Sequence, residues 1–133
     1  MNTIGKLLEF QSPAFPPDAD DEELVNSHCM HGHALATYIG GKIVNHGFKV
    51  KRYVAEDWGW YCEVENPEFE LWYGVSAMDE DRFLIQFCPN KPTIRRWFKK
   101  IDVSDRLTSL QHAVLKVLKE TDSRVADPQW TDG

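Results

Sequence analysis

The fold of this chain is set by four runs in the middle of its sequence: FKVKRYVA (residues 48–55), WYCEVE (60–65), FELWYGVSAM (69–78) and RFLIQFC (82–88). All four are rich in β-branched and aromatic residues, which favour strands. Short linkers of turn-forming and charged residues separate them, as is typical of hairpins. The four runs therefore predict an antiparallel β-meander.

Alternation inside the third run predicts which side chains face the core. Every second residue is apolar, and this set consists of Phe69, Leu71, Tyr73, Val75 and Ala77. Because successive side chains of a strand point to opposite faces, we expect this set to meet the core together. Trp72, Leu84 and Tyr61 are then expected on the outer face, where exposed apolar groups mark a partner surface or a dimer interface.

Two helices are predicted to flank these strands. Residues 32–46 carry apolar residues at helical spacing, and Asn45-His46-Gly47 supplies a C-cap with Gly47 in a left-handed conformation. Residues 103–121 form one apolar stripe, with Asp102 or Ser104 as the cap. The sequence thus predicts a two-layer α+β fold, in which an antiparallel sheet of four or five strands has both helices packed on one face.

The two ends of the chain carry weaker patterns. Residues 1–31 are interpreted as an irregular acidic arm that includes a short strand at residues 5–11, and residues 122–133 as a polar tail. The basic aromatic segment IRRWFKK (94–100) follows two prolines and receives no assignment. We interpret residues 1–133 as a single α+β domain, because one core is usual at this length.

Composition limits the classes of function. A net charge of −6 argues against nucleic-acid and membrane partners and is compatible with a basic protein partner. No apolar run approaches the roughly 20 residues that cross a bilayer. Cys29, Cys62 and Cys88 form an odd set without CxxC spacing, which is typical of reduced thiols in a cytoplasm. No cofactor motif is present in the sequence, and we predict no cofactor.

The string Glu56-Asp57-Trp58-Gly59-Trp60 joins the first two strands. Gly59 permits a bend between two indoles, and a carboxylate pair at such a bend suits a cationic group. Tryptophan is also frequent at interface hot spots. The predicted partner-binding residues are Glu56, Asp57, Trp58, Trp60 and Trp72. The alternative is that the tryptophans pack in the core and at the sheet edge, while the acids make turn hydrogen bonds.

The sequence contains little evidence for a catalytic site or a metal site. Adjacent strand residues point to opposite faces, so Glu56 and Asp57 are a poor acid and base pair, and we predict no catalytic residue. The segment HCMHGH (28–33) groups three histidines, but a helix does not align all of them. We predict no metal site, although metal binding by His28, His31 and His33 stays open.

The segment Arg95–Lys100 concentrates four positive charges in an acidic chain. Contact with phosphate is one interpretation of these charges. We instead expect Trp97 and Phe98 to anchor the segment to the core, with the charges in solvent or paired with acidic residues.

The order of helix, Asn45-His46-Gly47 cap, strand, Trp-Gly-Trp turn and aromatic meander resembles a class of small bacterial α+β proteins. It is similar, more loosely, to the acidic immunity proteins that neutralise toxins. The resemblance transfers no site residue. We expect a non-enzymatic protein-binding module, such as an immunity-type inhibitor of a basic protein. The alternatives are a small enzyme or ligand-binding domain with a pocket between sheet and helices, and a dimeric structural or accessory protein.

Overall fold

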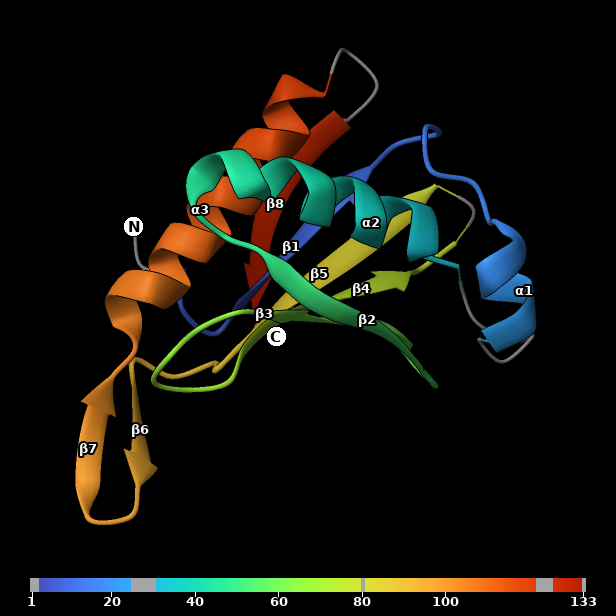
Figure 1. The fold of residues 1–133 in the computed structure, drawn as a ribbon. Coiled ribbons are helices and arrows are strands. Elements are labelled where there is room, and N and C mark those ends of the chain that lie inside the picture. Colours follow the sequence, from blue (N-terminus) through green and yellow to red (C-terminus); the bar gives the residue numbers. More distant parts are fainter. Residues whose placement is uncertain (1–2, 25–30, 80, 122–125, 133) are drawn as a thin grey trace.

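The computed structural model describes residues 3–24, 31–79, 81–121 and 126–132. Within these residues the chain is a mixed α+β fold with one large antiparallel sheet (Figure 1). The sheet has six strands in the order β2-β3-β4-β5-β1-β8. Their bounds are β1 Lys6–Gln11, β2 Val50–Glu56, β3 Gly59–Val64, β4 Leu71–Ala77, β5 Arg82–Cys88 and β8 Ala126–Asp132.

The predicted meander is the centre of this sheet, since β2, β3, β4 and β5 follow one another as neighbours. Two more strands extend the sheet: β1 confirms the short strand predicted at residues 5–11, whereas β8 lies in the segment interpreted as a polar tail. β1 pairs with β5 through Leu8 opposite Ile85, and β8 pairs with the other side of β1 through Trp130 opposite Leu8. The sheet is therefore wider than the predicted four or five strands.

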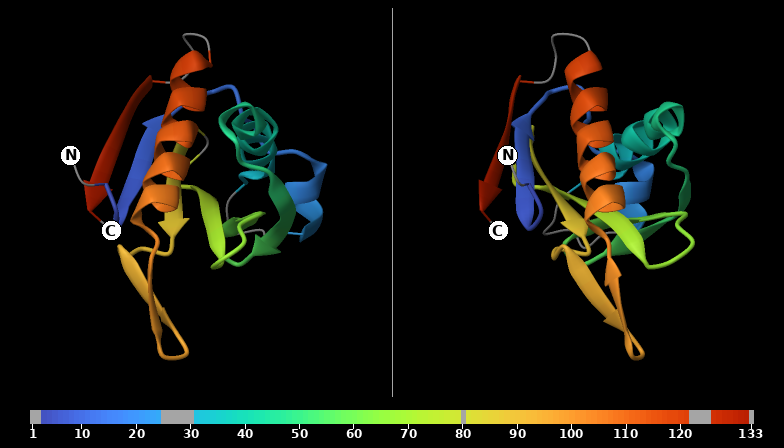
Figure 2. Two further views of the ribbon diagram at one scale, coloured as in Figure 1. Left: turned by 60° about the vertical axis from the view of Figure 1, so that its left-hand side comes forward. Right: turned by 90° about the vertical axis from the view of Figure 1, so that its left-hand side faces the viewer.

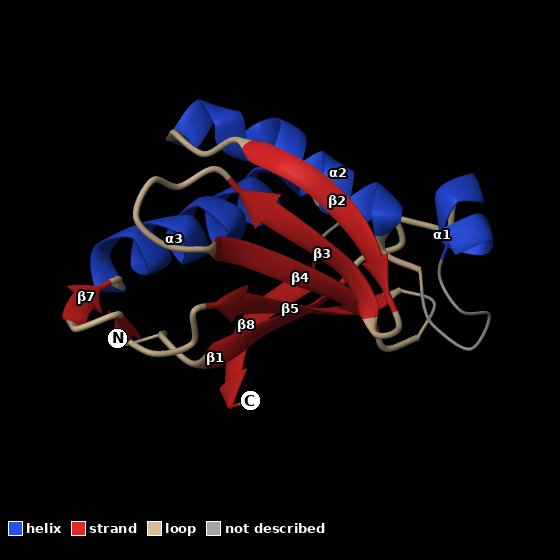
Figure 3. Cartoon of the chain, turned by 60° about the horizontal axis from the view of Figure 1, so that its bottom comes forward, coloured by secondary structure: helices blue, strands red, loops and turns tan. Residues whose placement is uncertain are grey.

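The two main helices cover one face of the sheet. They are α2 (His33–Lys42), which continues as the 3-10 helix η1 (Ile43–His46), and α3 (Ser104–Glu120). α2 packs over β2, β3 and β4, while α3 packs over β5 and β8 (Figure 2). In Figure 3 both helices lie behind the sheet. As predicted, Gly47 ends η1 in a left-handed conformation.

A third, short helix lies beside the start of α2. This helix, α1 (Ala19–Leu24), falls in the predicted irregular arm. Within the described residues, no helix combines the length and apolar character that a membrane span needs.

The core lies between the sheet and the helices. Its strand side carries the set predicted from alternation, because Phe69, Leu71, Tyr73, Val75 and Ala77 are all buried. Its helix side is built from apolar side chains of α2, η1 and α3, among them Leu35, Ile39, Ile43, Leu107, Leu110 and Val114. No helix or strand covers the opposite, outer face of the sheet within the described residues (Figure 3).

The unassigned basic segment is a two-stranded ribbon outside the main sheet. β6 (Thr93–Arg96) and β7 (Lys99–Asp102) pair in an antiparallel hairpin that projects from the base of the molecule (Figure 1). Trp97 and Phe98 form its tip and are 88% and 100% exposed. The prediction that these two residues anchor the segment to the core is therefore wrong.

Candidate functional site

Three aromatic side chains gather on the outer face of the sheet, and we call them the aromatic cluster: Trp58, Tyr61 and Trp72. The ring centroids of Tyr61 and Trp72 are 4.8 Å apart, and those of Trp58 and Trp72 are 5.9 Å apart. All three side chains are half-buried. Because the opposite face of these strands meets the helices, the cluster is held on a rigid support while one side of it stays accessible.

Glycine at two positions allows the cluster to form. Gly59 ends the β2–β3 turn with φ of 146°, and a Cβ there would lie 2.1 Å from the backbone oxygen of Val75. The turn can therefore approach β4 closely. A Cβ on Gly74 would lie 2.7 Å from the indole of Trp58. The bare backbone of Gly74 is the surface on which Trp58 rests.

Charged residues surround the aromatic cluster on the same face. The Tyr61 hydroxyl donates a short hydrogen bond to Glu70. Burial, together with this bond and the carboxylate charge, raises the pKa of Tyr61 well above its ordinary value, so the phenol stays neutral. Arg52 Nε lies 2.5 Å from Glu63 Oε1, and Lys51 Nζ lies 4.0 Å from Glu63 Oε2.

The predicted site residues do not all lie together. Glu56 and Asp57 are exposed at the β2–β3 turn next to Trp58, and Trp72 belongs to the aromatic cluster. Trp60 is only 2% exposed and points to the core side of β3. Because Trp60 cannot reach a partner from there, the prediction that Trp58 and Trp60 form one contact surface is corrected. Tyr61 takes its place on the outer face, as the alternation of the strand requires.

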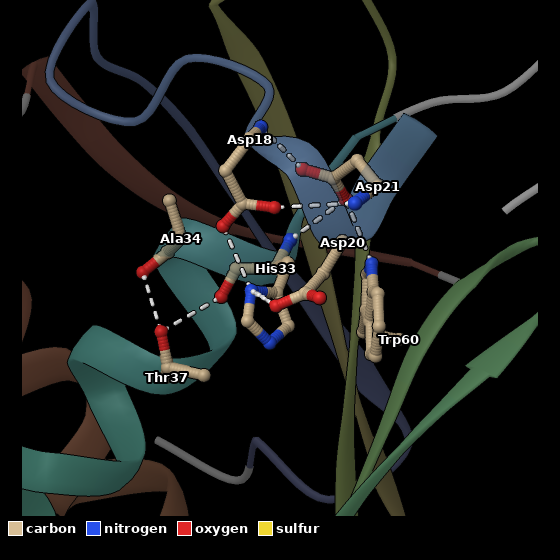
Figure 4. Close-up of polar contacts among 7 residues, drawn as sticks. All are labelled: Asp18, Asp20, Asp21, His33, Ala34, Thr37 and Trp60. Atoms are coloured by element: carbon tan, nitrogen blue, oxygen red, sulfur yellow. Dashed lines mark hydrogen bonds and ion pairs between the residues drawn. The ribbon is translucent and has the colours of Figure 1, made fainter. Parts of the chain in front are cut away.

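The indole of Trp60 belongs to a buried polar junction instead (Figure 4). Its Nε1 donates to Asp21 Oδ1 at 2.8 Å, and the backbone N–H of His33 donates to the same oxygen at 3.1 Å. Asp21 Oδ2 accepts from the backbone N–H of Asp18 at 3.0 Å. One carboxylate therefore joins α1, the first turn of α2 and β3. The sequence alone gave no sign of this contact, since Asp21 and Trp60 are 39 residues apart.

Among the described residues, a group of three side chains that could hold a cation lies at the same junction: Asp18, Asp20 and His33. His33 Nδ1 lies 2.7 Å from Asp18 Oδ2 and 3.4 Å from Asp20 Oδ2. One imidazole and two carboxylates suit a divalent ion. The His33 ring already makes a hydrogen bond to Asp18 Oδ2 that connects the start of α1 to α2, and Asp18 Oδ1 accepts from the backbone N–H of Asp21. These bonds give the cluster a structural role.

The three histidines considered for metal binding do not converge. His31 is buried, with its ring 5.3 Å from that of Phe83. His33 instead faces Asp18 and Asp20. His28 lies outside the described residues.

The ionisation of Asp18 reflects this network. Burial works against the charged form, but the hydrogen bonds from the His33 ring and from the backbone N–H of Asp21 outweigh it. The pKa of Asp18 is therefore lowered from its ordinary value.

A polar cleft lies between the β6–β7 hairpin and the main sheet. Its volume is about 750 Å³, and Arg95 and Arg96 line it opposite Glu63, Glu65 and Glu70. Arg96 also donates to the backbone oxygen of Glu68 at 3.0 Å, which holds the hairpin against the β3–β4 loop. This cleft is not the pocket between sheet and helices that the enzyme alternative expected.

No protein-family model, curated protein or solved structure matches this chain.

Proposed function

We propose that the protein is a non-enzymatic binding module that receives a basic protein partner on the outer face of its sheet. The observation that carries this proposal is the aromatic cluster, three adjoining rings that no element of the described chain covers. Large aromatic rings dominate binding energy at protein interfaces because they lose much water-exposed area while few bonds are immobilised.

The charge around the aromatic cluster supports a basic partner rather than an acidic one. Glu56, Asp57 and Glu70 are exposed near the cluster, and the chain as a whole carries a net charge of −6. Lysine and arginine side chains of a partner can pair with these carboxylates and lie over the aromatic faces. An immunity-type inhibitor that covers a basic toxin surface is one module with this chemistry.

The proposal is tested by affinity capture from the protein's own cells, with wild-type protein and with the double variant Trp58→Ala/Trp72→Ala. We expect wild-type protein to capture a basic protein in stoichiometric amount at low salt and to retain less of it at moderate salt. The double variant should capture none. Titration of that purified protein should then show that the variant binds it with at least ~30-fold lower affinity, since a hot-spot tryptophan contributes about 2 kcal/mol or more to binding.

The matched control is Trp97→Ala, which removes an exposed indole from the hairpin and leaves the outer face intact. It should keep the partner with unchanged affinity. Equal capture by wild type and by the Trp58→Ala/Trp72→Ala variant would refute the proposed face. If capture recovers only further copies of this chain, and the double variant is a monomer where the wild type is a dimer, the dimeric alternative would be favoured.

A further inference from the structure

The β6–β7 hairpin carries the most exposed apolar side chains in the described chain. Trp97 and Phe98 occupy the two central positions of its turn, at 88% and 100% exposure. They lie at the far end of a ribbon that projects from the molecule (Figure 1). Neither ring contributes to the core, so folding does not explain their presence.

The backbone of the turn makes the aromatic tip unfavourable for folding. Trp97 has φ of 62°, and Phe98 is not among the positive-φ residues. A positive φ at the first central residue of a two-residue hairpin turn is the type II′ pattern, which favours glycine at that position. A tryptophan there costs stability, which suggests that the exposed indole has a role outside the fold.

Four cations form a collar immediately behind the tip. Arg96 lies opposite Lys99, and Arg95 lies opposite Lys100. Because side chains alternate along a strand, these two pairs project from opposite faces of the ribbon. Like charges placed directly across a ribbon repel each other. Within the described residues none of the four makes a salt bridge to a carboxylate. Arg96 gives one N–H to the backbone oxygen of Glu68 and keeps its other guanidinium donors for a phosphate.

We propose that this hairpin inserts Trp97 and Phe98 into the headgroup region of an anionic lipid bilayer, while the four collar cations bind lipid phosphates. Tryptophan is favoured at the boundary between water and hydrocarbon, and basic side chains of a protein are attracted to acidic lipid headgroups, such as those of the cytoplasmic leaflet. A bilayer surrounds an inserted tip on all sides, which matches cations on both faces of the ribbon.

Other anionic partners fit this geometry less well. A stable protein interface buries about 800 Å² on each partner, which is more than a two-residue tip offers. Single-stranded nucleic acid needs rings spaced along a charged groove, so that successive bases can stack. Here both rings occupy one turn.

The acidic character of the rest of the chain does not prevent this contact. Setting the four collar cations aside leaves 11 of the 15 Lys and Arg against 21 Asp and Glu. Repulsion between this body and an anionic surface is screened over about 8 Å at physiological salt. Four strand residues extend about 13 Å, so the tip reaches a surface while most of the body lies beyond the screening length. Net charge sums over the whole chain and therefore does not reveal a local basic tip.

Vesicle sedimentation tests the proposal. We expect wild-type protein to sediment with vesicles of phosphatidylcholine and phosphatidylglycerol at low salt, and not with vesicles of phosphatidylcholine alone. The variant Trp97→Gly/Phe98→Asn places favoured turn residues at the tip and should keep the hairpin folded while vesicle affinity falls tenfold or more. The variant Arg95→Ala/Lys100→Ala should weaken binding by a comparable factor.

Lys116→Ala/Lys119→Ala is the matched control, because it removes the same charge from the exposed side of α3 and should leave vesicle binding unchanged. Failure of the wild type to bind anionic vesicles would overturn the proposal, as would equal binding by the tip variant. Tip-dependent binding of a single-stranded oligonucleotide or of polyglutamate without vesicle binding would assign the hairpin to another polyanion. Trp58→Ala/Trp72→Ala should bind vesicles normally, so this proposal and that of a protein partner fail independently.

Discussion

At the residue scale, two glycines of the outer face differ in what a side chain would meet. A methyl group on Gly59 would clash with the backbone of Val75 and would force a positive φ on a non-glycine residue. A methyl group on Gly74 would meet only the far end of the Trp58 ring and a Gln86 side chain, which can move. We expect Gly59→Ala to lower the free energy of unfolding by about 3 kcal/mol, and Gly74→Ala by less than about 1 kcal/mol. Urea denaturation of both variants measures the difference.

The Gly74→Ala variant also probes function, because it displaces Trp58 without removing it. Its tryptophan fluorescence should shift towards that of a more exposed indole, and its affinity for the proposed partner should fall. Equal stability losses at the two glycines would contradict the close approach of the β2–β3 turn to β4.

Residue-level alternation was the most informative signal in the sequence. It predicted the core-facing set of β4 and the outer position of Trp72 because burial of one face imposes a period of two. The role of Trp60 was not accessible in this way. Its partner Asp21 comes from a distant helix, and nothing in the local pattern of β3 indicates a buried carboxylate.

At the scale of elements, Asp21 is the connection between α1, α2 and β3. Asp21→Ala would leave the Nε1 of Trp60 and the backbone N–H of His33 without their acceptor. Each unsatisfied buried donor costs about 1–3 kcal/mol, so we expect a loss of about 3 kcal/mol in urea denaturation. Asp20→Ala is the control, since that side chain is exposed on the same helix and should cost less than about 0.5 kcal/mol. A loss at Asp21 no larger than this control would show that the junction is dispensable.

The strands β6, β7 and β8 were not predicted, because their local sequence does not favour strands or a tight turn. β8 contains Asp127 and Pro128, which disfavour strands, but an edge strand tolerates proline. The ring centroids of Trp130 and Phe87 are 5.8 Å apart, and this contact holds the strand in place. β6 and β7 are joined by Trp97-Phe98, which is not a recognised turn pair. In both places strand pairing outweighs local propensity, whereas in β2–β5 propensity and pairing agree.

At the scale of the whole molecule, ionisable groups limit the pH range of stability. The pKa of Asp18 is lowered from 3.8 despite burial, chiefly through its hydrogen bond to His33, and the pKa of Asp102 is lowered by hydrogen bonds from Ser104 at the start of α3. A group with a lowered folded pKa stabilises the protein above its unfolded pKa and loses that effect as pH falls through the folded value. Stability should therefore decline below about pH 4.

At alkaline pH we expect stability to fall as pH rises, and other groups are the cause. Burial raises the pKa of the Cys62 thiol above its ordinary value of 9.0, and burial likewise raises the pKa of Tyr73 above 10.0. The unfolded chain would release these protons first, so the stabilisation is present below about pH 9 and is lost as pH rises towards the folded values. Urea midpoints across the pH range should form a plateau between about pH 4 and pH 9. Asp18→Asn should flatten only the acid decline and Cys62→Ala only the alkaline one. If neither variant changes the slope on its side, the limits arise from the general charge of the chain, because that charge depends little on any one of these groups.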